Sequence, residues 1–411
     1  MLVGIVFVLG HLFHYALMLA ANRILEPGTF GRFYAAISLL NVLLTPVTVL
    51  GFMFAQHFSA VFSLAGAAAV VSELRMLLRQ HFAGGGIAAL ASGLALLVAA
   101  SFLGANAFML LVLVPSAALA IYLFELARAA LQGMLAFVLY SAMWIAWRAS
   151  QFILALLALH LTGAAWAGMA GILIATILST VLLLVLVFRR ARDSAMPVDG
   201  RGWPPLRIAP AVPFAAEYGI FVLVTNLDVL VAYLVLPNDM LGAYCASSLL
   251  PKAIVTATQP VSQVMLPVMN VSVKEVHLRR AALIKAILTC AFLSAGAAAA
   301  LGLGGGLVCN DRFGIRFCSP GLLTALALAA IPLAVLRVLV VAGLALGSGR
   351  HVLLCAGALI AFAAIIVFCV RSPTELAVAY VIFCWLFATL YAAAMHLGRR
   401  SPFRARGLAR T

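Results

Sequence analysis

Runs of apolar residues, each 18 or more residues long and nearly free of charge, recur along the whole length of this 411-residue chain. A helix of about 20 such residues crosses the hydrocarbon core of a bilayer, and α-helices satisfy their own backbone hydrogen bonds there. Only 9% of the residues are charged and 66% are hydrophobic, whereas soluble domains are roughly 25% charged. The chain is therefore predicted to be an all-α polytopic membrane protein.

We expect about twelve transmembrane helices in this sequence. Their approximate ranges are 2–22, 35–60, 84–104, 107–128, 136–160, 164–188, 211–236, 240–268, 282–306, 321–346, 351–370 and 376–397. The first run lacks a preceding basic region and an obvious cleavage site, so we interpret it as a span rather than a signal peptide. The segment 67–82 opposes apolar residues to Glu73, Arg75 and Arg79, which predicts a short amphipathic helix on the membrane surface.

The distribution of lysine and arginine predicts the orientation of the chain. If the N-terminus is inside, most of the 26 basic residues fall in cytoplasmic segments, as the positive-inside rule requires. Both termini are thus expected in the cytoplasm. The net charge of +15 is explained by topology and by contact with anionic lipid headgroups, so no nucleic-acid partner is expected.

The polar segment 189–210 carries four prolines and divides the sequence into two halves. We expect an N-terminal six-helix lobe over 1–188, a cytoplasmic linker over 189–210, a C-terminal six-helix lobe over 211–397 and a basic cytoplasmic tail over 398–411.

The two lobes are related by a weak internal repeat. GRFYA at 31–35 and GAYCA at 242–246 match at an offset of 211 residues, as do Leu39 and Leu250. The same offset sets Asn41 against Lys252. The repeat predicts two pseudo-symmetric lobes, each opening with a helical hairpin.

Two predicted spans between Glu217 and Gln263 carry the strongest polar pattern. Lys252, Thr256, Gln259 and Gln263 follow i, i+4, i+7 and i+11, and so share one face of an unbroken helix. A polar stripe on an otherwise apolar helix indicates the wall of a cavity rather than a surface toward lipid. Prolines are frequent in the spans, and each can kink its helix, although prolines are also common in membrane helices generally. The candidates are Pro46, Pro115, Pro251, Pro260, Pro267 and Pro332.

Three cations fall inside predicted spans, where each costs about 2.5–3.5 kcal/mol near the bilayer centre. Arg148 lies among Trp144, Trp147 and Gln151; it either pairs with an acid such as Glu217 or binds an anionic group of a substrate. Lys252 belongs to the polar stripe that indicates a cavity wall. Arg337 lies nearer the cytoplasmic half and either binds substrate or extends to the interface. We take Arg148, Lys252, Arg337, Gln259, Gln263 and Asn41 as candidate substrate-binding residues.

Glu217 and Asp228 are the acids of the same region. They are interpreted as counter-ions of the cations or, alternatively, as titratable groups that couple transport to a proton or sodium gradient. His11 and His14 share a face of the first span and either relay protons or pack as neutral groups.

Cys309 and Cys318 bracket the predicted outer loop CNDRFGIRFC. On the oxidising side of a bacterial inner membrane they are candidates for a disulfide that stabilises the loop by roughly 2–3 kcal/mol. The other cysteines have no metal-ligand spacing, and the chain has no nucleophile elbow, phosphate-binding loop or dinucleotide fingerprint. We therefore expect no metal, no cofactor and no enzymatic activity.

Two segments resemble the polysaccharide flippases of the Wzx type, within the multidrug/oligosaccharidyl-lipid/polysaccharide exporter superfamily. They are ANRILEPGTFGRFYAAISLLN at 21–41 and NLDVLVAYLVLPNDMLGAYCASSLLPK at 226–252. The residues that match are Arg23, Leu25, Pro27, Phe30, Gly31, Asn226, Asp228, Leu236, Gly242, Tyr244 and Ser247.

The resemblance implies export of an undecaprenyl-pyrophosphate-linked oligosaccharide across the bacterial inner membrane by alternating access of two lobes, for cell-surface polysaccharide biosynthesis. The implied partners are a lipid-linked anionic glycan, membrane lipids and, as a further candidate, a polysaccharide polymerase or glycosyltransferase. Two alternatives stay open. One is a cation-coupled drug exporter of the same superfamily, for which an acidic cavity is expected. The other is a non-transporting membrane scaffold of a polysaccharide secretion complex.

Overall fold

The computed structural model of the chain describes residues 2–100, 105–192, 212–262, 276–310, 315–346, 356–362, 364, 366 and 370–398. The chain divides into two compact units, Met1–Val212 and Pro213–Thr411. All the regular elements of the described ranges are α-helices, which confirms the all-α architecture predicted from the apolar runs.

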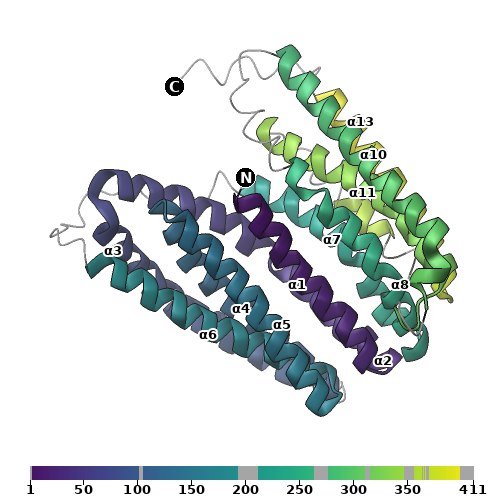
Figure 1. The fold of residues 1–411 in the computed structure, drawn as a ribbon, viewed down its shortest axis with the longest axis horizontal. Coiled ribbons are helices and arrows are strands. Elements are labelled where there is room, and N and C mark those ends of the chain that lie inside the picture. Colours follow the sequence, from purple (N-terminus) through teal and green to yellow (C-terminus); the bar gives the residue numbers. More distant parts are fainter. Residues whose placement is uncertain are drawn as a thin grey trace. The chain divides into compact units, whose positions relative to one another are not determined.

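The first unit holds six long helices, shown in purple to teal in Figure 1. They are α1 (Leu2–Ile24), α2 (Pro27–Leu43), α3 (Thr45–Ala100), α4 (Ala105–Gly133), α5 (Phe137–Thr162) and α6 (Ala165–Arg192). Within this unit α4 packs against α3 and α6, α6 packs against α5, and α5 packs against α1.

The second unit is organised around one central helix. Its helices are α7 (Val212–Val235), α8 (Asn238–Ala257), α10 (Val276–Val308), α11 (Pro320–Leu346) and α13 (Pro373–Gly398). Here α11 packs against α8, α10 and α13, and its apolar side chains are mostly buried.

Nine helical stretches within the described ranges are long and apolar enough to cross a membrane. Large apolar side chains also cover the outside of the helices: Phe292, Leu303 and Leu307 of α10 are 80%, 92% and 81% exposed. Such a surface is unfavourable in water and suits contact with lipid chains. The protein is therefore a multi-pass membrane protein.

Each unit begins with the same helical hairpin. α2 follows Glu26 (φ −66°, ψ 157°) and α8 follows Pro237 (φ −57°, ψ 154°), both extended residues that stop the preceding helix. The two positions are 211 residues apart, which is the offset of the internal repeat in the sequence.

Each hairpin also ends in the same break. α2 is followed by the C-cap residue Leu44 and α8 by the C-cap residue Thr258, and the helix resumes directly after each break. Pro46 and Pro260 follow these breaks by two residues, and a proline has no N–H to donate to the carbonyl four residues earlier. Pro115, Pro251 and Pro332 lie inside continuous helices, and Pro267 lies outside the described residues.

These breaks correct the expectation of unbroken helices over 35–60 and 240–268. They are 214 residues apart, whereas the helix starts are 211 apart, because α8 is three residues longer than α2. Lys252 therefore matches Asn41 when counted from the start of the helix but not when counted from its end.

The segment 67–82, expected as a short helix on the membrane surface, is instead part of the long helix α3. α3 bends at Gly66, whose backbone (φ 76°, ψ −170°) only glycine adopts readily, and continues to Ala100. Glu73 is buried rather than on a polar face, because its Oε1 lies 2.9 Å from Nε2 of His57. This contact joins the two legs of α3 across the bend, while Arg75 and Arg79 are exposed as expected.

Glycines bring α5 and α6 into backbone contact. A Cβ added to Gly171 of α6 would lie 2.6 Å from Cα of Ala155 and from the carbonyl oxygen of Leu154, and one added to Gly168 would lie 2.7 Å from the side chain of Leu159. Small residues at such positions let membrane helices approach closely. The close approach places side chains of α5 and α6 within hydrogen-bonding distance.

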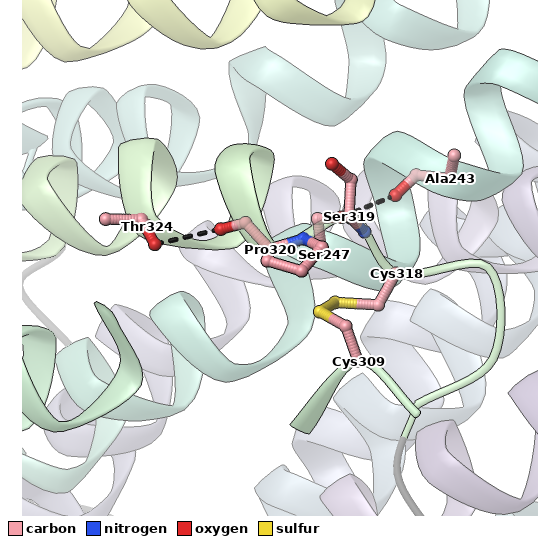
Figure 2. Close-up of a disulfide and its surroundings, with 7 residues drawn as sticks. All are labelled: Ala243, Ser247, Cys309, Cys318, Ser319, Pro320 and Thr324. Atoms are coloured by element: carbon pink, nitrogen blue, oxygen red, sulfur yellow. Dashed lines mark hydrogen bonds between the residues drawn. A yellow bond between two sulfur atoms is a disulfide. The ribbon is translucent and has the colours of Figure 1, made fainter. Parts of the chain in front are cut away.

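Cys309 and Cys318 are joined as a disulfide, with their Cα atoms 4.9 Å apart. The closed loop is also attached to α8. The backbone N–H of Ser319 donates to Oγ of Ser247 at 3.0 Å, and that hydroxyl donates to the carbonyl of Ala243 at 2.8 Å (Figure 2). Residues 311–314 of the loop are outside the described ranges. The disulfide and the serine together fix the start of α11 against α8.

Replacing Gly171 by leucine is expected to push α5 from α6, because the new side chain meets backbone atoms that cannot move aside. We expect a loss of about 1–3 kcal/mol in stability, measured as a lower midpoint of thermal unfolding in detergent. Gly296→Leu on α10 is the matched control, since nothing lies within 4 Å of a Cβ there. Equal midpoints for the two variants would contradict the close packing.

The disulfide can be tested by thiol labelling of a variant in which Cys309 and Cys318 are the only cysteines. A maleimide of high mass should shift neither sulfur on a gel until a reductant is added, after which both should react. The reduced protein should be less stable by roughly 2–3 kcal/mol. Labelling of both positions without reductant would disprove the bond.

Candidate functional site

A polar cavity lies within the first unit, among α1, α2, α4, α5 and α6. Its lining residues are Phe13, His14, Leu17, Ile37, Leu40, Asn41, Leu44, Ile121, Arg148, Gln151, Phe152 and Ile172. Most of the wall is apolar, and four polar side chains converge on it from three helices. Arg148 and Asn41, both predicted as substrate-binding residues, are thus on the same cavity.

Two indole rings hold the guanidinium of Arg148. Its central carbon lies 4.7 Å from the ring centroid of Trp144 and 4.4 Å from that of Trp147, which is the range of a cation–π interaction. Its Nη1 donates to Oε1 of Gln151 at 3.1 Å. Among the described residues, neither Nε, which is buried, nor Nη2 has a hydrogen-bond partner.

Arg128 of α4 allows a comparison with the hydrogen bonding of Arg148. Arg128 uses its Nε and Nη2 on one carboxylate oxygen of Glu125, at 3.0 Å and 2.7 Å. Arg128 also lies over the rings of Tyr140 and Trp144, at 4.4 Å and 4.5 Å. The two arginines thus share Trp144, but only Arg128 has an acid on the edge formed by Nε and Nη2. On the corresponding edge of Arg148, Nε is buried and no acid of the described residues is hydrogen-bonded.

A hydroxyl on α6 anchors the residues around Arg148. Oγ1 of Thr176 accepts hydrogen bonds from Nε1 of Trp147 and from Nε2 of Gln151, both at 3.1 Å. It donates to the carbonyl of Ile172 at 2.8 Å. No sequence pattern indicates Thr176, because threonine is common in apolar helices. Its role becomes visible only when α5 and α6 are packed together.

The histidines of α1 are divided between cavity and packing. His14 lines the cavity beside Arg148. His11 instead has an edge-on contact with the ring of Trp144, with 6.5 Å between centroids. Gly10 leaves room for Trp144, since a Cβ there would collide with the indole ring.

In the second unit, Lys252 has an internal partner. Its Nζ donates to Oδ1 of Asp228 at 2.9 Å, and the Asp228 side chain is 1% exposed while that of Lys252 is 16% exposed. Asp228 is therefore placed as the counter-ion of Lys252. The pair leaves this part of α7 and α8 without net charge.

The other predicted residues of the second unit are separate from this pair. Arg337, which is 8% exposed, donates from Nη1 to the carbonyl of Val255 at 3.3 Å and lies 5.5 Å from the ring of Phe221. Glu217 is buried, and its Oε2 accepts from the hydroxyl of Tyr391 at 3.4 Å. Gly343 leaves the space for this contact, because a Cβ there would lie 2.8 Å from the hydroxyl of Tyr391.

The predicted polar stripe is interrupted. Lys252 and Thr256 lie on α8, but Gln259 follows the break at Thr258. Gln263 lies outside the described residues. The expectation that these four residues share one face of a continuous helix is therefore wrong for Gln259. In the part of the chain that the structure describes, no group of three His, Cys, Asp or Glu side chains is arranged to hold a metal ion.

No protein-family model matches the chain, and no curated protein sequence matches it significantly. Solved transporter structures do match its fold. An outward-facing multidrug resistance MATE family transporter of the MOP superfamily has a TM-score of 0.63 and 14% identity, covering 97% of this chain and 96% of that one. An inward-facing structure of the same description has a TM-score of 0.67 and 15% identity, covering 94% and 96%.

The lipid II flippase MurJ, in an inward closed conformation, also matches. Its TM-score is 0.62 at 13% identity, covering 95% of this chain and 87% of that one. These proteins are transporters, and two of the structures differ in the side to which they open. The chain therefore has the two-lobe fold of the MOP-superfamily transporters.

Proposed function

We propose that this protein is a flippase that moves an undecaprenyl-pyrophosphate-linked oligosaccharide across the bacterial inner membrane by alternating access. The pyrophosphate and the adjoining sugars bind in the cavity of the first unit, while the lipid tail stays in the bilayer. Movement of the lobe 1–188 against the lobe 211–397 then exposes the headgroup on the other side. Supporting observations are the transporter fold, the lipid flippase among the similar structures and the chemistry of the cavity.

The observation that carries the proposal is that Arg148 lines the cavity and has no hydrogen-bonded acid among the described residues. A guanidinium binds phosphate with two parallel N–H donors, and Nε with Nη2 is such a pair. An unpaired charge inside a membrane protein is costly, so a sequence keeps it where a ligand completes it. The indole rings of Trp144 and Trp147, whose centroids are 5.1 Å apart, both lie against the guanidinium and cover part of its surface.

The other polar groups of the cavity suit an anionic headgroup with attached sugars. Asn41 and Gln151 carry amides, and His14 carries an imidazole; each can donate a hydrogen bond to phosphate or sugar oxygens. The described lining residues include no Asp or Glu. A drug exporter that carries cations would be expected to place an acid there, so the cavity favours the flippase over that alternative.

The role of the second unit is revised by its geometry. Lys252 is bound to Asp228, and Arg337 is bound to a backbone carbonyl, so these cations are less available than Arg148. We therefore assign recognition of the phosphate to Arg148 and a structural pairing to Lys252 and Asp228. Glu217, with Tyr391 as its neighbour, stays a candidate for ion coupling.

Arg148→Ala is expected to lower export at least about tenfold, because a charged hydrogen-bond donor contributes 1.5–3 kcal/mol. The test is complementation of a flippase-deficient strain. Surface glycan should fall, and lipid-linked precursor should accumulate in the inner leaflet, while the amount of the variant in the membrane stays constant. Arg148→Lys should retain part of the activity because it keeps the charge.

Arg79→Ala is the matched control, since Arg79 lies in the same unit, is exposed and does not line the cavity. Arg337→Ala and Lys252→Ala should affect export less than Arg148→Ala at equal membrane levels. Normal export by the Arg148→Ala variant would contradict the proposal and would favour the non-transporting scaffold.

The pairing of Lys252 with Asp228 predicts a stability effect. Lys252→Met leaves a buried carboxylate without its cation, which should cost about 3 kcal/mol and lower the midpoint of thermal unfolding. The double variant Lys252→Met with Asp228→Leu should regain most of that loss and also export glycan. A double variant that is stable but does not export would instead place Lys252 in substrate binding.

A further inference from the structure

The contacts of Arg148 depend on one atom that does not touch it. Oγ1 of Thr176 binds both Trp147 and Gln151, and each of these in turn contacts the guanidinium, Trp147 through its ring and Gln151 through its amide oxygen. Two of the three contacts that hold Arg148 therefore pass through the hydroxyl of Thr176.

The hydrogen-bonding capacity of this hydroxyl is fully used. A threonine hydroxyl has one proton and accepts two hydrogen bonds, and here it donates to Ile172 and accepts from Trp147 and Gln151. Thr176 is 0% exposed, so water does not replace any of the three. The arrangement leaves the hydroxyl with one orientation.

The orientation of Thr176 decides which end of the Gln151 amide faces Arg148. Because Nε2 of Gln151 donates to Thr176, the oxygen Oε1 at the other end is turned toward Nη1 of Arg148. An amide in the opposite orientation would present N–H groups to the guanidinium and could not accept its proton. The hydroxyl likewise fixes the indole of Trp147, which covers one face of Arg148.

We propose that Thr176 is a positioning residue that holds Arg148, through Gln151 and Trp147, on the cavity wall where it meets a phosphate. This inference rests on the proposed function, because it concerns the same anion site. Thr176 itself does not contact the substrate.

A second hydrogen bond between the same helices supplies a control. Oγ of Ser150 and Oγ of Ser179 are 3.1 Å apart, close to the next turn of α5 and α6. This pair links the helices as the Thr176 bonds do, but among the described residues the hydrogen bonds of the two serines do not include the side chain of Arg148. A purely structural contribution from an interhelical hydrogen bond would be removed equally by Ser179→Ala.

The test uses the full-length protein in lipid nanodiscs, with inorganic pyrophosphate as the probe and tryptophan fluorescence as the readout. The wild type is expected to bind pyrophosphate, and Arg148→Ala is expected to abolish binding. Thr176→Val keeps the shape but loses the hydroxyl, and should weaken binding about tenfold. Thr176→Ser restores the hydroxyl and should bind like the wild type, as should Ser179→Ala.

A double-mutant cycle keeps the inference testable if Thr176→Val also lowers stability. Gln151→Leu should weaken binding. The double variant Gln151→Leu with Thr176→Val should weaken binding by less than the product of the two separate factors, because the two residues act along one path. Ser179→Ala should combine with Gln151→Leu independently.

The outcomes separate the two proposals. If the wild type does not bind pyrophosphate, or if Arg148→Ala binds it normally, the anion site and the inference that depends on it are both overturned. If Arg148→Ala abolishes binding while Thr176→Val binds like the wild type, the anion site stands and the positioning role is wrong. The positioning role is also wrong if Thr176→Val and Ser179→Ala weaken binding equally.

Discussion

The burial of one guanidinium organises the first unit. A charge moved from water into a membrane protein loses its hydration. For Arg148, the π faces of Trp144 and Trp147 and the oxygen of Gln151 replace part of the lost stabilisation. Each of these groups needs its own support. Gly10 makes room for Trp144, Thr176 binds Trp147 and Gln151, and the glycines of α6 bring Thr176 within reach. The packing of three helices thus serves one side chain.

The two units treat their intramembrane charges differently. The first joins Arg128 to Glu125 and leaves Arg148 without a hydrogen-bonded acid among the described residues, whereas the second binds Lys252 to Asp228. A neutral pair attracts an anion less strongly than a guanidinium that has no carboxylate partner. Under the proposed function, the phosphate is therefore recognised in the first unit.

The helical architecture could be predicted, and Arg148 could be singled out as a candidate, because both are anomalies in composition. Apolar runs of bilayer length have one main structural solution, and an arginine among apolar residues and tryptophans stands out. The partner of Lys252 could not be decided, because the rotation of α7 against α8 determines whether Asp228 faces it. Thr176 gave no signal at all, since its three hydrogen bonds exist only after α5 and α6 approach. Glu73 was placed on a polar face because a single-helix pattern does not include His57, on the other leg of α3.

The prolines show a similar limit of sequence reasoning and lead to a consequence for movement. Pro46 and Pro260 break their helices while Pro251 does not, although all three lack the same N–H. Asn41, on the cavity wall, lies just before the break at Leu44, whereas Arg148 and Gln151 both stand on α5, which packs closely against the glycines of α6. The helix break therefore lies beside one polar wall of the cavity, and the close packing of α5 and α6 supports the other. Under the proposed function, a change in the bend at Leu44 would move Asn41 relative to Arg148 and so change the width of the cavity.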